Sequence, residues 1–209
     1  MDRKRFLHSA GALGAGAYFG AAPYVHARRP FADLVLRGAV VYDGSGMPPM
    51  EVDVAITGDR IEAVASGLAR GTNEIDLNGL ALAPGFVDIH SHADMSLLIN
   101  PKAESRIRQG VTLEVVGQDG GSIGPWSESE RERQNANYQR NYGIPIDFKD
   151  VGGFLNRIDR VRPAVNVASM VGQGTIRGYI VGFRDRPAND GEIRQMRGLL
   201  RQALEGLSL

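Results

Sequence analysis

The sequence predicts an α/β fold in which a block of short strands precedes a block of alternating strands and helices. Between residues 31 and 83, short runs of alternating apolar and polar residues are separated by turn signals such as Asn78-Gly79. At Pro84-Gly85 the pattern changes to short apolar strands separated by helical stretches. Because strands that alternate with helices pair in parallel through crossover connections, the second block indicates α/β architecture.

The first block, residues 31–83, is expected to form a small antiparallel sheet. A Gly58-Asp59 turn joins two of its runs as a hairpin, and Asn78-Gly79 joins two more. The expected strands are residues 33–37, 39–42, 53–56, 60–64, 74–77 and 80–83.

The second block, residues 84–209, is expected to contain three parallel strands separated by helices. The last residues before Leu209 carry no helix stop signal, and three parallel strands alone would leave an exposed hydrophobic edge. We therefore expect the natural fold to continue beyond Leu209. The expected strands are residues 86–89, 111–116 and 164–170, and the expected helices are near 101–109, 127–142, 151–160 and 190–204.

The composition excludes several kinds of site. The 209 residues carry 24 Lys and Arg against 24 Asp and Glu, and this balance, without a basic patch, argues against a nucleic-acid partner. There is no cysteine, so disulfides and thiol nucleophiles are excluded, and any metal must be bound by histidines and carboxylates. After the N-terminal region no apolar run is long enough to span a membrane, so we expect no membrane partner.

Residues 1–27 have the layout of a signal peptide. The basic run Arg3-Lys4-Arg5 is followed by an apolar stretch over residues 10–22, and Val25-His26-Ala27 offers small residues for cleavage. This start resembles a twin-arginine export signal with Lys4 in place of the second arginine, so the general secretory route stays open as an alternative. By either route we expect export to the periplasm or the extracellular space.

The segment His90-Ser91-His92 is the main candidate site. Side chains two positions apart on a strand point to the same side, so two imidazoles at this spacing can bind one cation together. In parallel α/β barrels the C-terminal ends of the strands carry the chemistry, and these histidines come directly after the expected strand 86–89. The pattern therefore predicts a metal site at the end of this strand.

The stretch from Pro84 to His92 resembles the first-strand motif of the amidohydrolase superfamily, and the block before it resembles that superfamily's small β-sandwich domain. From about residue 32 to residue 209, the chain is similar to the N-acyl-D-amino-acid deacylase (D-aminoacylase) family. This similarity implies a (β/α)8 TIM-type barrel that begins after the sandwich block and is truncated after about three strands. It rests on residues 90–94, 100–105, 108–112, 163–168 and 172–177.

The resemblance also implies a cofactor of one or two divalent metal ions, most simply zinc. In the family a Cys after the second strand binds metal, and Asp119 stands at that position in this chain. A carboxylate can bind zinc but also suits harder metals, so Asp119 is a candidate ligand, and a role in shaping the Gly-rich turn is the alternative. Gln173 stands where many relatives carry His, so whatever that His does has no counterpart here.

Three more polar residues lie near the candidate site in the sequence. Arg177 is a candidate for binding a substrate carboxylate through its planar guanidinium, with a structural role as the alternative. Asp88 lies on the opposite face of its strand from Ile89, where structural hydrogen bonding is expected. Asp94 is a candidate for contacting either the metal ligands or the loop around them.

The implied activity is metal-dependent hydrolysis of the N-acyl amide bond of a D-amino acid, which is a small-molecule substrate. The family's general base is an Asp after the last barrel strand, and we expect it beyond residue 209. The 209-residue chain alone is therefore expected to be inactive. A cyclic amidase resembling dihydroorotase or hydantoinase, and a non-catalytic truncated module, are the alternatives.

Overall fold

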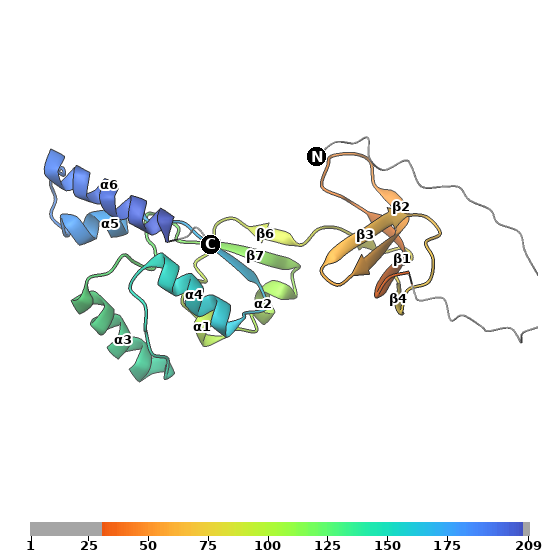
Figure 1. Cartoon of the computed structure of the whole chain (residues 1–209), viewed down its shortest axis with the longest axis horizontal. Helices are drawn as coiled ribbons and strands as arrows, with labels where there is room; N and C mark the ends of the chain where they lie inside the picture. The colour runs from red at the N-terminus through yellow and green to blue at the C-terminus, as the bar shows by residue number, and fades with distance from the viewer. Residues whose placement is uncertain (1–30, 207–209) are drawn as a thin grey trace, which may run out of the picture. The chain divides into compact units, whose positions relative to one another are not determined.

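The computed structural model describes residues 31–206, and the expected signal peptide, residues 1–27, lies outside them. The chain divides into two compact units with the boundary between Leu82 and Ala83, and Figure 1 draws both. Among residues 31–206, no helix is both long enough and apolar enough to cross a membrane.

The first unit is a five-stranded sheet in the order β3-β2-β1-β4, with β5 also paired to β1. Strands β2 and β3 are antiparallel, as the Gly58-Asp59 turn predicts. Strands β4 and β5 are parallel to β1, so the sheet is mixed and the expectation of an antiparallel sheet is wrong. The strands are β1 Leu34–Val41, β2 Met50–Thr57, β3 Arg60–Ala65, β4 Asn73–Asp76 and β5 Ala81–Leu82.

The hairpin expected at Asn78-Gly79 is not formed. Strand β4 pairs with Leu34–Arg37 and β5 pairs with Val40 and Val41, so both follow β1 in the same direction. The turn therefore shifts the chain along β1 instead of reversing it.

Strand β1 contains a bulge at Gly38. The sequence predicts two strands here, whereas the structure has one strand whose pairing with β2 shifts between Leu36 and Ala39. Gly38 has a φ of +64°, and a Cβ at this position would lie 2.0 Å from Oδ1 of Asn78. Glycine therefore allows the bulge and the turn to meet.

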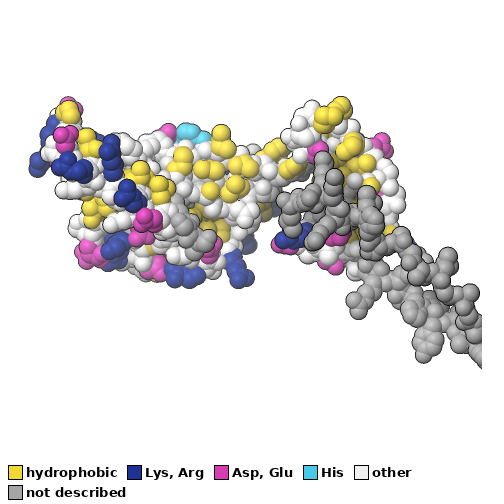
Figure 2. Space-filling view, turned by 45° about the horizontal axis from the view of Figure 1, so that its top comes forward, with side chains coloured by type: hydrophobic (Ala, Val, Ile, Leu, Met, Phe, Trp, Pro, Cys, Tyr) yellow, Lys and Arg dark blue, Asp and Glu magenta, His cyan; other side chains and the backbone are white. Residues whose placement is uncertain are grey.

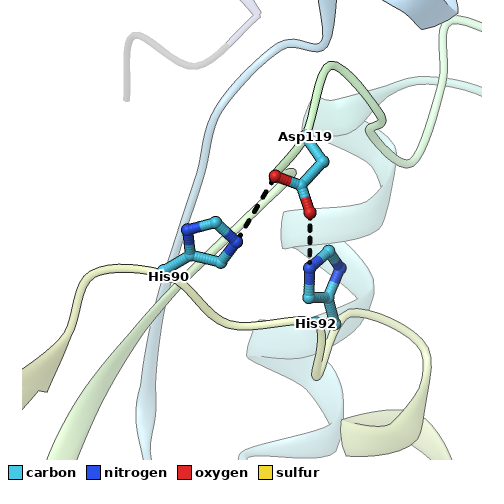
Figure 3. Close-up of side chains that lie close together, drawn as sticks. All are labelled: His90, His92 and Asp119. Atoms are coloured by element: carbon cyan, nitrogen blue, oxygen red, sulfur yellow. Dashed lines mark hydrogen bonds and ion pairs between the residues drawn. The ribbon is translucent and has the colours of Figure 1, made fainter.

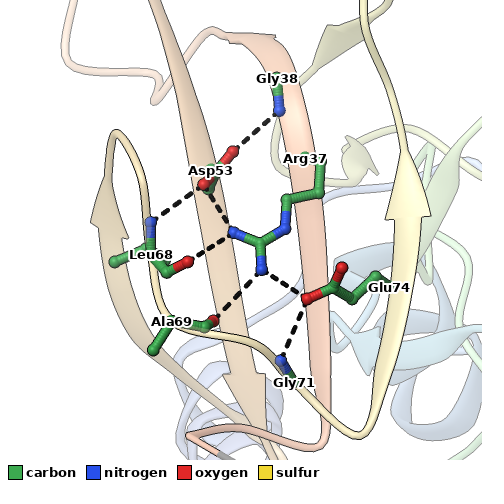
Figure 4. Close-up of polar contacts among 7 residues, drawn as sticks. All are labelled: Arg37, Gly38, Asp53, Leu68, Ala69, Gly71 and Glu74. Carbon is green, nitrogen blue, oxygen red and sulfur yellow. Dashed lines mark hydrogen bonds and ion pairs between the residues drawn. The ribbon is translucent and has the colours of Figure 1, made fainter.

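Arg37, beside the bulge, connects three parts of the first unit (Figure 4). Its guanidinium donates hydrogen bonds to Asp53 on β2 at 2.8 Å, to the Leu68 carbonyl at 2.7 Å and to Glu74 on β4. Asp53 also accepts from the backbone N–H groups of Gly38 at 3.0 Å and Leu68 at 3.1 Å. These hydrogen bonds, first from Gly38 and then from Arg37, lower the pKa of Asp53.

Replacing Asp53 with asparagine is expected to lower the amide protection factors of β1 and β2 at pH 7 by about tenfold, because charge-assisted hydrogen bonds are lost. The lowered pKa means that the stabilisation is present above the usual value of 3.8 and is lost as the pH falls through the folded value. The difference from the native chain should therefore shrink below about pH 4. Hydrogen exchange of peptides from residues 31–82 measures it, with Asp59→Asn, at a side chain 95% exposed, as the control. Equal protection in the two variants at pH 7 would contradict this role of Asp53.

The second unit contains a parallel three-stranded sheet in the order β6-β7-β8. The parallel pairing and the alternation with helices confirm the predicted α/β class. The strands are β6 Phe86–Asp88, β7 Val111–Val116 and β8 Asn166–Ser169. The helices are α1 Ser96–Ile99, α2 Glu104–Ile107, α3 Glu128–Tyr142, α4 Val151–Val161, α5 Gln173–Ile180 and α6 Asp190–Glu205.

The sequence does not predict α1 or α5. Helix α5 contains Gly174 and Gly178, which lower helix propensity, and α1 has only four residues, too few to display a helical period. The helix expected near residues 101–109 is confined to α2, because Ala103 takes a left-handed conformation with φ +45° directly before it.

Helices cover one face of the parallel sheet. Val116 of β7 packs in one buried cluster with Phe154 and Ile158 of α4, and Figure 1 shows α1, α2 and α4 together on this side. In contrast, the side chains of Val87 and Ile89, whose positions alternate with Asp88, are 50% and 74% exposed. Figure 2 shows exposed hydrophobic side chains close to the histidines, which are drawn in cyan. Val87 and Ile89 are therefore outside the buried cluster that contains Val116.

Candidate metal centre

His90 and His92 follow the end of β6, and both rings are exposed. Their ring centroids are 5.5 Å apart, and their side chains are 59% and 63% exposed. Ser91 between them is buried, since its N–H donates to the Val115 carbonyl at 3.0 Å and its Oγ accepts from the Ala93 N–H at 3.1 Å. Burial of Ser91 leaves both imidazoles on the same side, as strand alternation predicts.

Asp119 lies in the loop that follows β7. It has a φ of +55°, a left-handed conformation that Asp tolerates better than most residues, and Gly117 before it has a φ of +82°. Gln118 is buried, and its side-chain amide donates hydrogen bonds to the Ile89 carbonyl at 2.9 Å and the Val115 carbonyl at 2.8 Å. The bond to Ile89 holds the loop against the segment that carries the histidines, and the bond to Val115 ties it to the end of β7.

The carboxylate of Asp119 faces both imidazoles (Figure 3). Nε2 of His90 lies 3.5 Å from Oδ1, and Nε2 of His92 lies 3.1 Å from Oδ2. One ligand atom from each residue lies within 4.8 Å of the other two, and in the described part of the chain no other cluster of three or more His, Cys, Asp or Glu is grouped in this way. Residues far apart in the sequence therefore converge on one point.

The three donors fit a zinc ion. Bonds of about 2.0–2.2 Å in a tetrahedral site separate neighbouring ligand atoms by roughly 3.4 Å. The separations of 3.1 and 3.5 Å between the ring nitrogens and the Asp119 oxygens are close to that value. Two imidazoles and one carboxylate are usual zinc ligands, and three protein ligands leave a position open, as in catalytic zinc sites.

Arg177 directs its guanidinium at the backbone that follows α5. NH1 donates to the Gly182 carbonyl at 3.0 Å, and NH2 donates to the carbonyls of Arg184 at 3.0 Å and Arg186 at 2.5 Å. These bonds fold the segment back on the helix, which is the structural role that the sequence left open. Binding of a substrate carboxylate by Arg177 stays a prediction.

The other polar residues near the site surround the three candidate ligands without joining them. Asp88 accepts hydrogen bonds from Arg106 at 3.3 Å and from the His90 N–H at 3.2 Å, so its predicted structural role is confirmed. Partial burial raises the pKa of Asp94, and its carboxyl lies outside the group of candidate ligands. Gln173 is exposed at the start of α5.

A cleft of about 710 Å³ opens beside Asp119. Its walls include Trp126, Tyr179 and Phe183, and Trp126 stacks on Phe148 with ring centroids 6.1 Å apart. Neither a motif nor a spacing in the sequence assigns these aromatic residues to a site. A cleft of this size can admit a small molecule next to the candidate ligands.

Two buried residues that the sequence analysis misses also contact the site. Gln118 holds the Asp119 loop, and the fully buried Glu114 of β7 accepts a hydrogen bond from Ser91 Oγ. Glu114 could have been recognised from the sequence, because it lies within a run of strand-forming residues. A carboxylate in a buried strand needs a polar partner.

Residues 73–208 match the sequence model of the amidohydrolase family. The chain belongs to this family. The resemblance to amidohydrolases that the sequence motifs indicate is thereby confirmed.

Curated relatives of this amidohydrolase include two deacylases of Alcaligenes xylosoxydans xylosoxydans. The D-aminoacylase is 36% identical over 186 residues, which cover 84% of this chain and 36% of the relative. The N-acyl-D-aspartate deacylase is 37% identical over 177 residues, which cover 83% of this chain and 35% of the relative. The predicted similarity to N-acyl-D-amino-acid deacylases is confirmed, and the chain spans about a third of the length of these relatives.

Solved structures of two related enzymes have the same fold over this part of the chain. A D-aminoacylase described with a binuclear metal centre matches with a TM-score of 0.72 at 33% identity, covering 84% of this amidohydrolase chain and 37% of the other. An N-acyl-D-glutamate deacylase from Bordetella bronchiseptica, complexed with zinc and a phosphonate inhibitor, matches with a TM-score of 0.69 at 30% identity, covering 83% and 36%. Both of these similar proteins contain metal.

Proposed function

We propose that this amidohydrolase chain forms the first part of the zinc site of an enzyme that hydrolyses the N-acyl amide bond of D-amino acids. The observation that carries the proposal is the convergence of His90, His92 and Asp119 within 4.8 Å of one another. The names of the deacylase relatives supply the substrate class. The resemblance of residues 1–27 to an export signal supports a location in the periplasm or the extracellular space.

In the proposed enzyme the second unit is the start of a (β/α)8 barrel, and the first unit belongs to a small β-sandwich domain. Strands β6, β7 and β8 are parallel and neighbour one another in chain order, as the first strands of such a barrel do. The candidate ligands follow β6 and β7 at the ends where barrel enzymes carry their chemistry. Both features support a barrel completed by further strands.

Nε2 of His90, Nε2 of His92 and the carboxylate of Asp119 would hold the zinc ion. When bound, zinc supplies a Lewis acid that polarises a carbonyl group and lowers the pKa of a coordinated water. The chain's own part is to aim two imidazoles and one carboxylate at a single point, with the carboxylate facing both rings. The cleft beside Asp119, with its aromatic walls, would admit the substrate. The general base is expected beyond residue 209.

The zinc-loaded full-length protein is expected to release free amino acid from N-acetyl-D-amino acids about 100-fold faster than from the L-enantiomers. If the side chain and the carboxylate of the substrate keep their contacts, inverting the configuration at the α-carbon moves the amide away from its position relative to the metal. Chiral chromatography of the products measures the ratio. The 209-residue chain assayed alone is expected to give no turnover.

Preference for the L-enantiomers would contradict the proposed substrate class. Turnover of hydantoins or dihydroorotate in place of N-acyl amino acids would favour the cyclic-amidase alternative. Rapid turnover by the 209-residue chain alone would contradict the expected position of the general base.

A further inference from the structure

Glu114 is fully buried in β7, directly behind the segment that carries the two histidines. Its Oε2 accepts a hydrogen bond from Oγ of Ser91, the residue between the two candidate ligands. Ser91 is only 1% exposed, and its N–H also donates to the carbonyl of Val115, the next residue of the same strand. Strand β7 thus holds the middle of the His90–His92 segment from behind.

Arg106 of α2 extends this contact to β6. Its Nε lies 3.2 Å from Glu114 Oε1, and its NH1 donates to Asp88 at 3.3 Å. The other carboxylate oxygen of Asp88 accepts from the His90 N–H at 3.2 Å. Glu114 is therefore connected to the histidine segment in two ways. It accepts a hydrogen bond from Ser91, and it is linked through Arg106 and Asp88 to the backbone N–H of His90.

Stability alone does not account for a glutamate at this position. Oε1 of Glu114 is buried and accepts no hydrogen bond, and its contact is the ion pair with Arg106 Nε at 3.2 Å. A buried ion pair is often no more stabilising than well-packed apolar residues in place of both partners. Two residues further along β7, Val116 is apolar and equally buried. What distinguishes the Glu114 position is the contact with Ser91.

We propose that Glu114 is a positioning residue that fixes the His90–His92 segment, so that both imidazoles aim at one metal ion. It acts through Ser91 and Arg106 and does not contact the metal. The inference rests on the proposed function, since it assigns Glu114 to the same metal site. Partners behind metal ligands commonly set ligand orientation, and their loss typically weakens metal binding about 10–100-fold.

Glu114→Met is expected to weaken zinc affinity about 10–100-fold and to change the visible absorption of the cobalt-substituted chain, which reports ligand geometry. Its unfolding midpoint in urea is expected to fall, because the buried Ser91 Oγ loses its acceptor and Arg106 loses its ion-pair partner. A purely structural role predicts the same loss of stability with unchanged zinc affinity and an unchanged cobalt spectrum. Thr112→Val, two residues earlier on β7, is the matched control and should leave zinc affinity unchanged.

Ser91→Ala removes the same hydrogen bond with a smaller change of shape, and it should reproduce the loss of affinity if Glu114→Met fails to fold. Unchanged zinc affinity and an unchanged cobalt spectrum in the folded variants would overturn the proposal. If the native chain binds no zinc, the proposed function fails, and the ring NMR signals of metal-free His90 and His92 then decide the positioning role. Broadened or shifted signals in the variants support it, and signals identical to those of the native chain overturn it.

Discussion

Replacing His92 with alanine is expected to weaken zinc binding by the chain about 100-fold or more. Loss of a residue that only hydrogen-bonds a metal ligand typically lowers metal affinity about 10–100-fold, and loss of the ligand itself should lower it at least as much. Nε2 of His92 is 3.1 Å from the Asp119 carboxylate, whereas Nε2 of His90 is 3.5 Å away. Without His92, only His90 and Asp119 remain, and two protein ligands are fewer than zinc sites normally use. Competition with a chelating dye measures the affinity.

The sequence contains two further histidines, His8 and His26, which could also bind zinc. The competition with the dye is therefore measured in a chain in which both are replaced by alanine. Glu132→Gln, which removes an exposed carboxylate from α3, is the control for a general effect of charge and should not change the affinity. Asp119→Asn should weaken binding in the same direction as His92→Ala, because a neutral amide is the weaker donor. If His92→Ala bound zinc as tightly as its parent, the candidate site would be rejected.

The sequence predicts how the two histidines are placed, and it predicts the contacts around them only in part. His90 and His92 are both exposed on either side of the buried Ser91, as their two-residue spacing predicts, although β6 ends at Asp88. Only the family resemblance predicts Asp119 as a ligand. Its approach to the two histidines depends on a left-handed loop conformation and on the two hydrogen bonds of Gln118. The contacts of Gln118 with Ile89 and of Asp119 with His92 join residues 29 and 27 positions apart, and they leave no period in the sequence.

The same distinction between local and long-range structure applies to the fold. The α/β class follows from hydrophobic periodicity, and the three strands of the second unit were all predicted. The pairing of β4 and β5 with β1 was not, because the choice between a hairpin at Asn78-Gly79 and two parallel pairings depends on which edge of β1 is free. Turn propensity alone does not contain that information.

Gly117→Ala is expected to destabilise the second unit by about 3 kcal/mol or more, through two separate costs. Gly117 has a φ of +82°, and a left-handed conformation costs an ordinary residue about 1–2 kcal/mol. A Cβ there would also lie 2.5 Å from the backbone carbonyl oxygen of Met170. Since the Met170 N–H donates to the Val116 carbonyl at 2.9 Å, the backbone cannot yield without weakening the pairing of β7 with β8.

Gly182→Ala separates these two costs. Gly182 has a φ of +74°, and no atom lies within 4 Å of its Cβ position, so this variant carries only the conformational cost of about 1–2 kcal/mol. Trp126 is the only tryptophan of the sequence and packs against the core of the second unit, so its fluorescence in urea reports the stability of both variants. Because Gly117 begins the loop that carries Asp119, its replacement should lower zinc affinity as well, whereas Gly182→Ala should not. Equal urea midpoints for the two variants would mean that the ends of β7 and β8 can separate without loss, and that the Asp119 loop is not held by this close approach.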